Sequence, residues 1–560
     1  MRYFLFFVIN LIFTFSLSAE EDTSDWLNYS SKWFFSEIKS ENSSNTQFNK
    51  RDYLVNNDNN TFEYKISKKN LFAKGTWTLN NNLIVFNYSL PSDTTREYLI
   101  DYTEDQLILF ENNINYIFSK NPIITKSKTS IFNKILRGIL GLISLIFLAF
   151  LFSRDRKNIN WSLVIKGLLI QVLLAILILK VPIIQDIFEW ISSLFVTVLQ
   201  FSKQGALFLF GDTLVNSNEF GAIFAFQILP TILFFSALTS LLFYLGILQK
   251  IVFAFAYIMK KTLRLSGAES LSAAGNIFLG QTESPLLIKP YIEKMTMSEL
   301  LCLMSGGMAT IAGGVLAAYI GFLGGNDPVQ QLFFAKHLLT ASVMSAPAAV
   351  VLAKILLPET EEINEDMTIS NEKLGSNSFE AISIGTGQGV RLAINVGAML
   401  LVFIAFITMI NYFLKDFFGD ITGLNNSIIS FTDGQYTGLT LEFLLGYMLA
   451  PLTWLMGVCK EDMILVGQLL GEKTILNEFV AYISLSDLKE SGRFFEEKSI
   501  IISTYILCGF ANFLSIGIQI GGIGSLAPNR TSDLSKLGIL ALIAGTLASL
   551  LTAVIVGAIL

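Results

Sequence analysis

Histidine and cysteine are scarce in this chain of 560 residues. His337 is its one histidine, and Cys302, Cys459 and Cys508 lie far apart, each inside an apolar segment. A single histidine argues against a histidine-rich metal centre and against Ser-His-Asp chemistry, and we expect it to be a hydrogen-bonded core residue. The cysteines have neither CxxC spacing nor an even number, so we expect buried thiols rather than a zinc site or a disulfide framework.

Charge is also scarce, and recognisable enzyme motifs are missing. Charged residues make up 15% of the chain and hydrophobic residues 52%, a balance too apolar for a soluble globular protein and typical of a polytopic membrane protein. The net charge is -6 and basic residues form short clusters, which argues against a nucleic-acid partner. The sequence has no HExxH motif, phosphate-binding loop or GxSxG motif, so we do not expect an enzyme.

The N-terminal part of the chain differs from the rest. Residues 1–19 combine Arg2, an apolar run and small residues at the end, the pattern of a secretory signal peptide, with an uncleaved anchor as the alternative. The polar residues 20–127 alternate with apolar ones over 61–66, 76–79, 83–86 and 106–110, which predicts short strands joined by turns. We therefore expect an extracytoplasmic, lipocalin-like β-rich accessory domain over 20–127, ahead of a membrane domain over 128–560.

Apolar segments follow in quick succession from Ile131. Eight of them are near the ~20 residues that a helix needs to cross a bilayer: 131–152, 161–183, 221–247, 299–323, 332–357, 390–414, 498–522 and 537–560. Five further segments are apolar but broken, and fit interfacial helices and hairpins better: 185–212, 250–265, 268–290, 438–457 and 460–487. The expected fold is an all-α polytopic membrane protein with about eight transmembrane helices, preceded by a small β domain.

Loop charges orient these segments. Lysine and arginine collect in cytoplasmic loops, and here they lie at Arg154, Arg156, Lys157, Lys260, Lys261, Arg264, Lys289, Lys294, Arg530 and Lys536. The turn 324–331 has neither residue and is expected to face outwards. The acidic run 359–366 is expected to be a solvated cytoplasmic loop. This orientation puts the N-terminal domain and the C-terminus outside the cytoplasmic (inner) membrane.

Two polar stretches, 280–285 and 477–482, interrupt the apolar sequence. A carboxylate at membrane depth costs at least a few kcal/mol, so Glu283 and Glu478 are candidates for a functional site, with a structural polar network as the alternative. By the loop charges, the first stretch enters and leaves from the inside and the second from the outside, and each precedes a glycine-rich span. Two re-entrant hairpins in an inverted repeat are an architecture of secondary transporters.

The second stretch lies inside a long motif. GEKTILNEFVA at 471–481 resembles the G-x-K-x-x-x-N-E-F-V-A motif of concentrative nucleoside transporters. Further similar segments follow in the family's order: 280–291, 309–313, HLLTASVMSAP at 337–347, CGFAN at 508–512, and 528–530. The resemblance runs from about residue 135 to the C-terminus. The N-terminal domain resembles no part of the animal transporters, and Ser284 stands where many members have alanine.

The resemblance implies a nucleoside site shared by both polar stretches. It assigns the nucleobase to Gln281, Thr282, Glu283 and Val315, the ribose to Glu478, Asn512 and Ser515, and a place in the pocket lining to Phe510. The chemistry agrees, because an ionised carboxylate makes strong charge-assisted bonds to hydroxyl donors. Amide and hydroxyl groups match the donors and acceptors of a base edge. By residue type alone, Phe510 is more often a core residue.

The resemblance also implies a sodium site beside the first polar stretch. It assigns the side chains of Asn276 and Thr310 and the backbone carbonyls of Leu279 and Ile311, and unwound backbone carbonyls suit such a site. Residue by residue there are alternatives: Asn276 as a helix cap, and Thr310 bonded back to its own helix.

Together these features predict a sodium-coupled nucleoside importer that works by alternating access. The resemblance further implies a homotrimer, in which a hairpin-bearing unit moves against a scaffold of the first, second, third and sixth spans. Three alternatives stay open. They are proton coupling through Glu283 or Glu478, an extracytoplasmic sensor built on the β domain, and an intramembrane enzyme that uses carboxylates.

Overall fold

The computed structural model describes residues 31–39, 52–57, 60–66, 71–80, 83–90, 92–103, 106–111, 114–120, 130–215, 224–325, 327–369, 375–432 and 434–560. The chain divides into two compact units, Met1–Lys126 and Ser127–Leu560. Each unit is described by itself. The predicted signal peptide, 1–19, lies outside the described residues.

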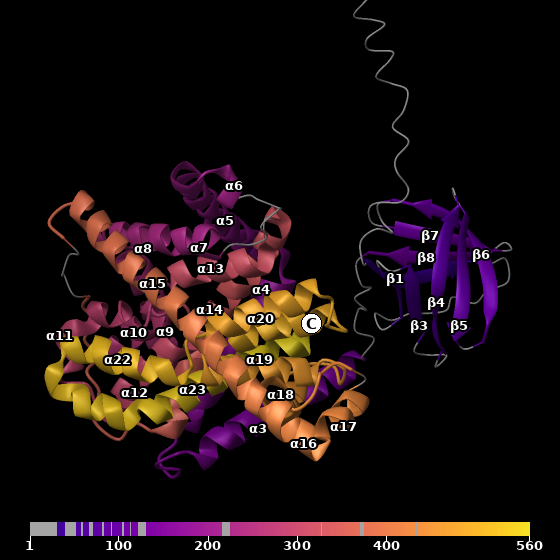
Figure 1. Ribbon diagram of the computed structural model, residues 1–560. Coiled ribbons are helices and arrows are strands. Elements are labelled where there is room, and N and C mark those ends of the chain that lie inside the picture. Colours follow the sequence, from indigo (N-terminus) through magenta and orange to yellow (C-terminus); the bar gives the residue numbers. More distant parts are fainter. Residues whose placement is uncertain are drawn as a thin grey trace, which may run out of the picture. The chain divides into compact units, whose positions relative to one another are not determined.

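The first unit is a closed antiparallel barrel in which every strand pairs with its neighbour in sequence and β1 pairs with β8 (Figure 1). Its strands are β1 (Ser31–Lys39), β2 (Tyr53–Asn56), β3 (Thr61–Ile66), β4 (Leu71–Asn80), β5 (Leu83–Leu90), β6 (Thr94–Tyr102), β7 (Gln106–Glu111) and β8 (Ile114–Ser119). The four predicted strand patterns lie within β3, β4, β5 and β7. Sequence reasoning did not predict the other four strands.

Aromatic side chains fill the barrel. Phe62 and Phe86 lie with ring centroids 4.4 Å apart, as do Phe35 and Phe118, and Trp33 is 1% exposed. An eight-stranded barrel has an interior just wide enough for its own side chains or for one small ligand. This interior is an aromatic core, which explains why so small a unit holds together.

The second unit is helical. Its long helices are α3 (Ile131–Leu151), α4 (Trp161–Lys180), α5 (Pro182–Phe210), α8 (Leu229–Tyr244), α9 (Ile247–Leu263), α14 (Pro328–Leu356), α15 (Ser378–Asn411) and α23 (Thr531–Ile559). Shorter elements connect them: α6 (Asp212–Val215), α7 (Phe224–Gln227), η3 (Tyr412–Gly419), α16 (Asp420–Thr422), α17 (Leu424–Phe431), α18 (Leu441–Leu455) and η4 (Pro528–Arg530). The most apolar stretch of α14 is buried along its whole length, so this helix lies at the centre of the unit.

In the described part of the chain, eight helical stretches are long and apolar enough to cross a membrane. Seven of them overlap predicted spans, and two predictions were wrong. The segment 185–212 is not broken, because α5 is one continuous helix of 29 residues with Pro182 in its first turn, where proline is tolerated. The segment 498–522 is not one continuous helix, because α21 (Glu497–Leu507) ends before Cys508 and α22 (Phe513–Leu526) begins after Asn512. The predicted span 299–323 is interrupted in the same way at residues 310–312.

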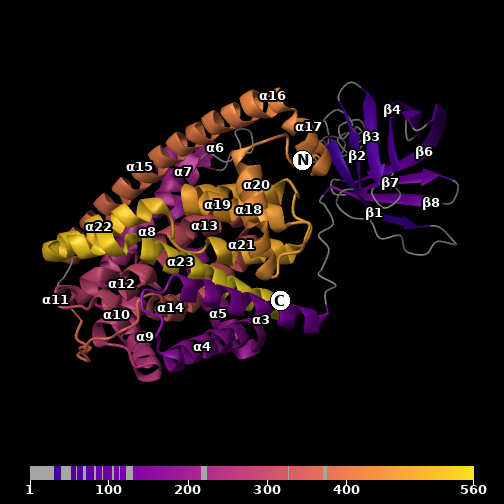
Figure 2. The ribbon, with the colours of Figure 1, turned by 90° about the horizontal axis from the view of Figure 1, so that it is seen from below.

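The remaining helices come in interrupted pairs. The chain breaks between α12 (Met297–Ala309) and α13 (Gly313–Gly324), as it does between α21 and α22. Ahead of the first break lie α10 (Gly267–Gly275), η2 (Ser284–Ile288) and α11 (Lys289–Ile292), and ahead of the second lie α19 (Met463–Ile475) and α20 (Glu478–Glu490). Figure 2 shows α10 and α11 beside α12, and α19 and α20 beside α18 and α21. The first polar stretch begins between α10 and η2, and the second begins at Asn477 between α19 and α20 and continues into α20.

Candidate functional site

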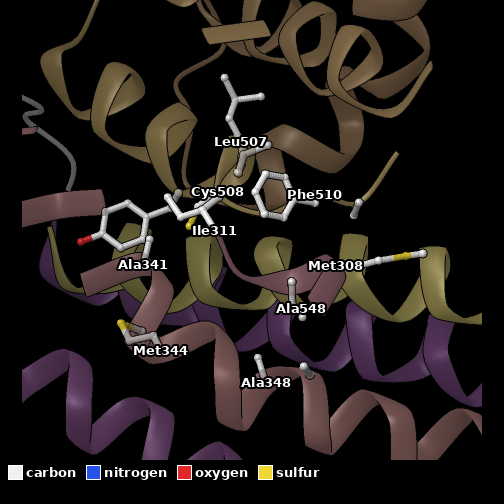
Figure 3. Packing of buried hydrophobic residues seen from close by; sticks show 14 of the residues in the cluster. Met308, Ile311, Ala341, Met344, Ala348, Leu507, Cys508, Phe510 and Ala548 are labelled. Atoms are coloured by element: carbon white, nitrogen blue, oxygen red, sulfur yellow. The ribbon is translucent and has the colours of Figure 1, made fainter. Parts of the chain in front are cut away.

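The two breaks lie against each other in the middle of the helical unit. Gly509 has a φ of 118°, which favours glycine, and a Cβ built there would lie 2.7 Å from Ala309 O. Any side chain at this position would therefore push the end of α12 away. Figure 3 shows Ile311, Cys508 and Phe510 in the packed hydrophobic cluster around the breaks. The close approach brings the two non-helical segments into one region.

The second polar stretch places a carboxylate at a helix start. The Asn477 side chain accepts a hydrogen bond from Val480 N at 2.9 Å and so caps α20, which puts Glu478 in the first turn, where negative charge is favourable. Glu478 is 4% exposed, and its Oε2 accepts from Asn512 Nδ2 at 2.6 Å. Asn512 Oδ1 in turn accepts from Ser515 N at 2.9 Å and caps α22. The α20 and α22 starts are thus joined through side chains.

The first polar stretch packs onto the same helix. Gln281 Nε2 donates to Ser515 Oγ at 3.3 Å. A Cβ built on Gly522 would lie 2.6 Å from Thr282 Cγ2, so the loop rests directly on the α22 backbone. The Glu283 carboxylate turns back to its own loop, because its Oε2 accepts from Gly280 N.

The structure thus brings most of the predicted polar site residues together. Gln281, Ser515, Asn512 and Glu478 form one connected polar series from the first stretch to the second. The two apolar candidates differ from them. Val315 on α13 is 2% exposed and Phe510 is 8% exposed, and both belong to the large hydrophobic cluster.

The predicted sodium ligands lie between α10 and the first break. Asn276 is 1% exposed, and within the described part of the chain both its amide atoms are buried without a hydrogen-bond partner. Asn276 is the C-cap residue of α10, and its backbone N–H donates to Ser272 O at 2.9 Å, which confirms the helix-cap alternative for the backbone and leaves the side chain unused by the cap. Thr310 Oγ1 donates to Gly306 O at 2.9 Å, which confirms the bond to its own helix and leaves the oxygen lone pairs available.

Sequence reasoning missed the role of a buried lysine. Lys473 on α19 is completely buried, and its ammonium donates to Ile506 O at 2.9 Å and to Ser549 Oγ at 3.0 Å. These hydrogen bonds connect α19, the helix that leads to the second polar stretch, to the end of α21 and to α23. The sequence signal was present, because this lysine is the K of the motif at 471–481, but its partners are distant in the chain.

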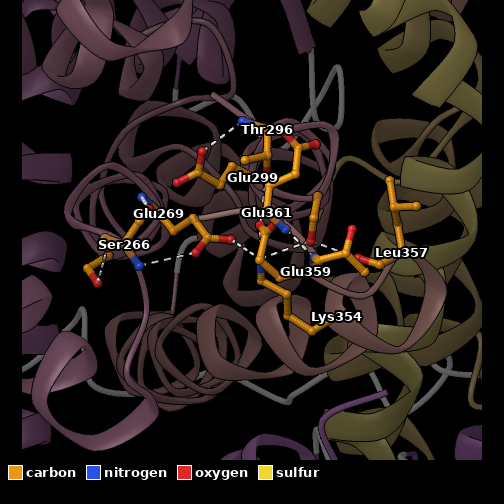
Figure 4. A network of polar contacts seen from close by, with 11 residues as sticks. Ser266, Glu269, Thr296, Glu299, Lys354, Leu357, Glu359 and Glu361 are labelled. Atoms are coloured by element: carbon orange, nitrogen blue, oxygen red, sulfur yellow. Dashed lines mark hydrogen bonds and ion pairs between the residues drawn. The ribbon is translucent and has the colours of Figure 1, made fainter. Parts of the chain in front are cut away.

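A second buried lysine anchors the base of α10 (Figure 4). Lys354 Nζ lies 2.5 Å from Glu269 Oε1 and 3.2 Å from Glu359 Oε2, and Glu359 also accepts from Thr296 Oγ1 at 2.8 Å. Burial acts to raise the pKa of Glu359, but the Lys354 charge and these donors hold it below its ordinary value. The prediction of a solvated acidic loop was therefore wrong at Glu359.

The segment that follows Glu359 also contacts its neighbours. Gly267 N at the start of α10 donates to Asn364 O at 3.0 Å, and Lys260 Nζ at the end of α9 donates to Glu365 O at 2.6 Å. These contacts hold the segment across the starts of α10 and α12, because Glu359 already bonds the residue that caps α12.

Comparison of the chain with known proteins identifies its family. Three family models match: the N-terminal part of Na+ dependent nucleoside transporters at 140–213, a nucleoside recognition gate at 225–326, and the C-terminal part of the same transporters at 337–557. An uncharacterized transporter of Haemophilus influenzae is 41% identical over 427 residues, which are 76% of this chain and 97% of that protein. The chain belongs to the sodium-dependent nucleoside transporter family.

Other relatives carry functional names. Sodium/nucleoside cotransporter 1 of Rattus norvegicus is 39% identical over 430 residues, and solute carrier family 28 member 3 of Eptatretus stoutii is 42% identical over 433 residues. The matches cover 74% of this chain, but 62% and 59% of those longer relatives. Because its relatives are cotransporters, this nucleoside transporter family member is a transport protein rather than an enzyme.

Solved structures agree with the fold. The structure of CNTnw in an inward-facing substrate-bound state has a TM-score of 0.67 at 38% identity, and covers 76% of this chain and 98% of that one. A doubly substituted form of CNTnw in an outward-facing state matches with a TM-score of 0.67 at 37% identity and covers 76% of this chain and 97% of that one. The helical unit is thus a polytopic membrane transporter fold.

Proposed function

We propose that this transporter imports nucleosides together with sodium by alternating access. The observation that carries the proposal is the polar series from Gln281 through Ser515 and Asn512 to Glu478. One non-helical tip, which carries Gln281, and the starts of α20 and α22 converge there, so a molecule with a polar base and a hydroxylated ring can bond to all three.

The two ends of the polar series offer different groups to a nucleoside. Glu478 and Asn512 offer a charged acceptor and an amide for ribose hydroxyls, and charge-assisted bonds are about twice as strong as neutral ones. Gln281 and Thr282 offer an amide and a hydroxyl for the edge of a base, with Glu283, Val315 and Phe510 around them. A site built from such groups rejects analogues that leave its buried polar atoms unpaired.

Asn276 supports sodium as the coupling ion. A buried amide with no partner carries a desolvation cost, and a sodium ion would remove that cost at the oxygen. We propose that the ion binds Asn276 and Thr310 by their side chains and Leu279 and Ile311 by their carbonyls. Among the described residues, no group of three or more His, Cys, Asp or Glu could hold a metal, so amide, hydroxyl and carbonyl oxygens are the ligands to expect.

We further propose how the chain sits in the membrane. The segments from α10 to α11 and from α19 to α20, which carry Glu283 and Glu478, are re-entrant hairpins of opposite orientation in an inverted repeat, and they move with the broken spans α12–α13 and α21–α22 against the remaining helices. The chain assembles as a homotrimer in the lipid bilayer of the inner membrane, with the C-terminus outside. The barrel is an extracytoplasmic accessory domain behind a signal peptide, and its packed aromatic core supports a passive role.

Uptake of labelled uridine into vesicles tests this function. With an imposed sodium gradient and the pH clamped equal on both sides, sodium is expected to stimulate uptake, and Asn276→Ala is expected to raise the sodium concentration needed for half-maximal uptake. Uptake is measured in parallel with a proton gradient and no sodium. Stimulation by protons and not by sodium would replace the sodium assignment with proton coupling, and no uridine uptake under either gradient would refute the proposed function.

A further inference from the structure

Gln519 lies on the face of α22 that meets the first polar stretch. Ser515, Gln519 and Gly522 follow the i, i+4, i+7 spacing of one helix face. Gln519 is 0% exposed, whereas Ile518 beside it is 38% exposed. The helix therefore turns this glutamine into the protein, between the residue that bonds Gln281 and the residue that contacts Thr282.

Gln519 and Gln281 are neighbours in space. A Cβ built on Gly307 of α12 would lie 2.6 Å from Gln519 Nε2 and 2.9 Å from Gln281 Cβ. The two glutamines come from segments more than two hundred residues apart, and the bare backbone of α12 leaves room for both. The base end of the series thus has a second amide beside the predicted one.

Hydrogen bonding fixes which way the Gln519 amide points. Its Nε2 donates to Met304 O at 2.9 Å, and a carbonyl can accept but not donate. Its Oε1 is buried and has no partner within the described part of the chain. Gln281 bonds a serine hydroxyl, which can donate or accept, so that amide is free to turn over. Gln519 is therefore a fixed acceptor, and Gln281 an adaptable group.

We propose that Gln519 determines specificity at the base, by accepting a hydrogen bond from an amino group on the nucleobase. Bases with an exocyclic amino group, as in cytidine and adenosine, satisfy this buried acceptor, whereas the same base without that group leaves the acceptor unpaired. The proposal rests on the proposed function, because it assumes that the base end of a nucleoside lies between the first polar stretch and α22.

Inhibition of labelled uridine uptake tests the proposal on the whole protein. The probes are cytidine and the riboside of 2-pyrimidinone, which is cytidine without its amino group. Wild-type protein is expected to bind cytidine about three- to tenfold more tightly, the range for one hydrogen bond. Gln519→Met keeps the side-chain length and removes the acceptor, so the ratio of the two inhibition constants is expected to fall below about twofold.

Gln171 on α4 is a matched control. It is 0% exposed, its Nε2 donates to Met344 O at 3.1 Å, and its Oε1 is also buried without a partner among the described residues. Because Gln171 lies outside the polar series, Gln171→Met is expected to keep the wild-type ratio. A fall of the ratio in both variants would assign the effect to the loss of a buried amide in general and would overturn the proposal.

Two results bear on the proposal even if Gln519→Met does not fold. Equal inhibition of the wild-type protein by the two ribosides overturns it without any variant. Gln519→Asn keeps a buried amide but shortens the side chain by one methylene, which moves the acceptor away from the base. If the ratio of the two inhibition constants in Gln519→Asn stays at the wild-type value, the proposal is overturned. Sodium-driven uridine uptake by the wild type is measured in the same vesicles, and its absence would refute the proposed function rather than the role of Gln519.

Discussion

Glu478→Gln is the substitution that tests the polar series most directly. Glu478 is 4% exposed and accepts from Asn512 Nδ2 at 2.6 Å. Glutamine has the same length, and its oxygen can still accept that bond, so the substitution removes the charge and leaves the packing. Its effect on binding therefore reports the bonds that a carboxylate makes to substrate hydroxyls.

The size of the effect follows from the kind of bond that is lost. A hydrogen bond to a charged group contributes about 1.5–3 kcal/mol, against about 0.5–1.5 kcal/mol for a neutral one. If the ribose makes two such bonds, the charge accounts for about 2 kcal/mol, or roughly thirtyfold in affinity at 1.4 kcal/mol per factor of ten. A nucleoside analogue that lacks both ribose hydroxyls is expected to lose much less.

The assay is the concentration dependence of labelled uridine uptake, with the dideoxy analogue as competitor. Glu472→Gln is the matched control, because Glu472 is also 4% exposed and lies on the preceding helix, where its carboxylate accepts from Gln468 Nε2 at 2.8 Å. We expect weaker uridine binding in Glu478→Gln and a smaller change in Glu472→Gln. Unchanged uridine affinity in Glu478→Gln, or equal losses for uridine and the dideoxy analogue, would refute the reasoning.

Three further predictions concern the support of the site. Lys473→Met removes the ammonium that bonds α21 and α23, and is expected to cost about 2 kcal/mol and to lower the melting temperature of the purified protein. Gly522→Ala places a Cβ 2.6 Å from the first polar stretch. Because overpacking costs about 1–3 kcal/mol, uridine affinity is expected to fall at least about fivefold. Glu359→Gln leaves Lys354 with one carboxylate fewer and is expected to lower the melting temperature. Since the folded pKa of Glu359 is depressed, wild type is expected to lose the same stabilisation as the pH falls from about 4.3 through that folded pKa.

Two of these predictions have a control in the chain. A Cβ at Gly521 meets nothing within 4 Å among the described residues, so Gly521→Ala is expected to transport normally, and equal losses in both glycine variants would contradict the contact. Glu361 is exposed, and an equal fall in melting temperature for Glu361→Gln would remove the special role of Glu359. A melting temperature that does not change in Lys473→Met would show that its hydrogen bonds are offset by the cost of burying the charge.

The sequence predicted interruptions at the two polar stretches because polar residues stand out against an apolar background, and Glu283 and Glu478 were identified in this way. The break between α21 and α22 was not predicted, because 498–522 is apolar almost throughout and looks like one span. Local composition could not show that Gln519 meets Gln281, or that Lys473 reaches α23, because these contacts join residues distant in the chain. The contacts of Gln519 and Lys473 therefore became visible only in three dimensions.

Two predictions failed for reasons of local physics. The segment 185–212 contains charges and amides that suggested a broken helix, but α5 is continuous through them and through Gly205. Polar residues do not end a helix, a single glycine costs only about 1 kcal/mol, and the one proline of α5 stands in the first turn, where it is tolerated. Glu359 belongs to a run of acids that suggested a solvated loop. A single buried lysine on α14 binds it, and composition gives no sign of such a partner.

The closed barrel has a consequence for how neighbouring copies of the protein can pack. A strand with a free edge can add to the edge of another copy, and such pairing leads to aggregation. In the N-terminal unit β1 pairs with β8, so the ring of strands is complete and presents no such edge. Neighbouring copies of this domain can therefore be crowded together without joining into a continuous sheet.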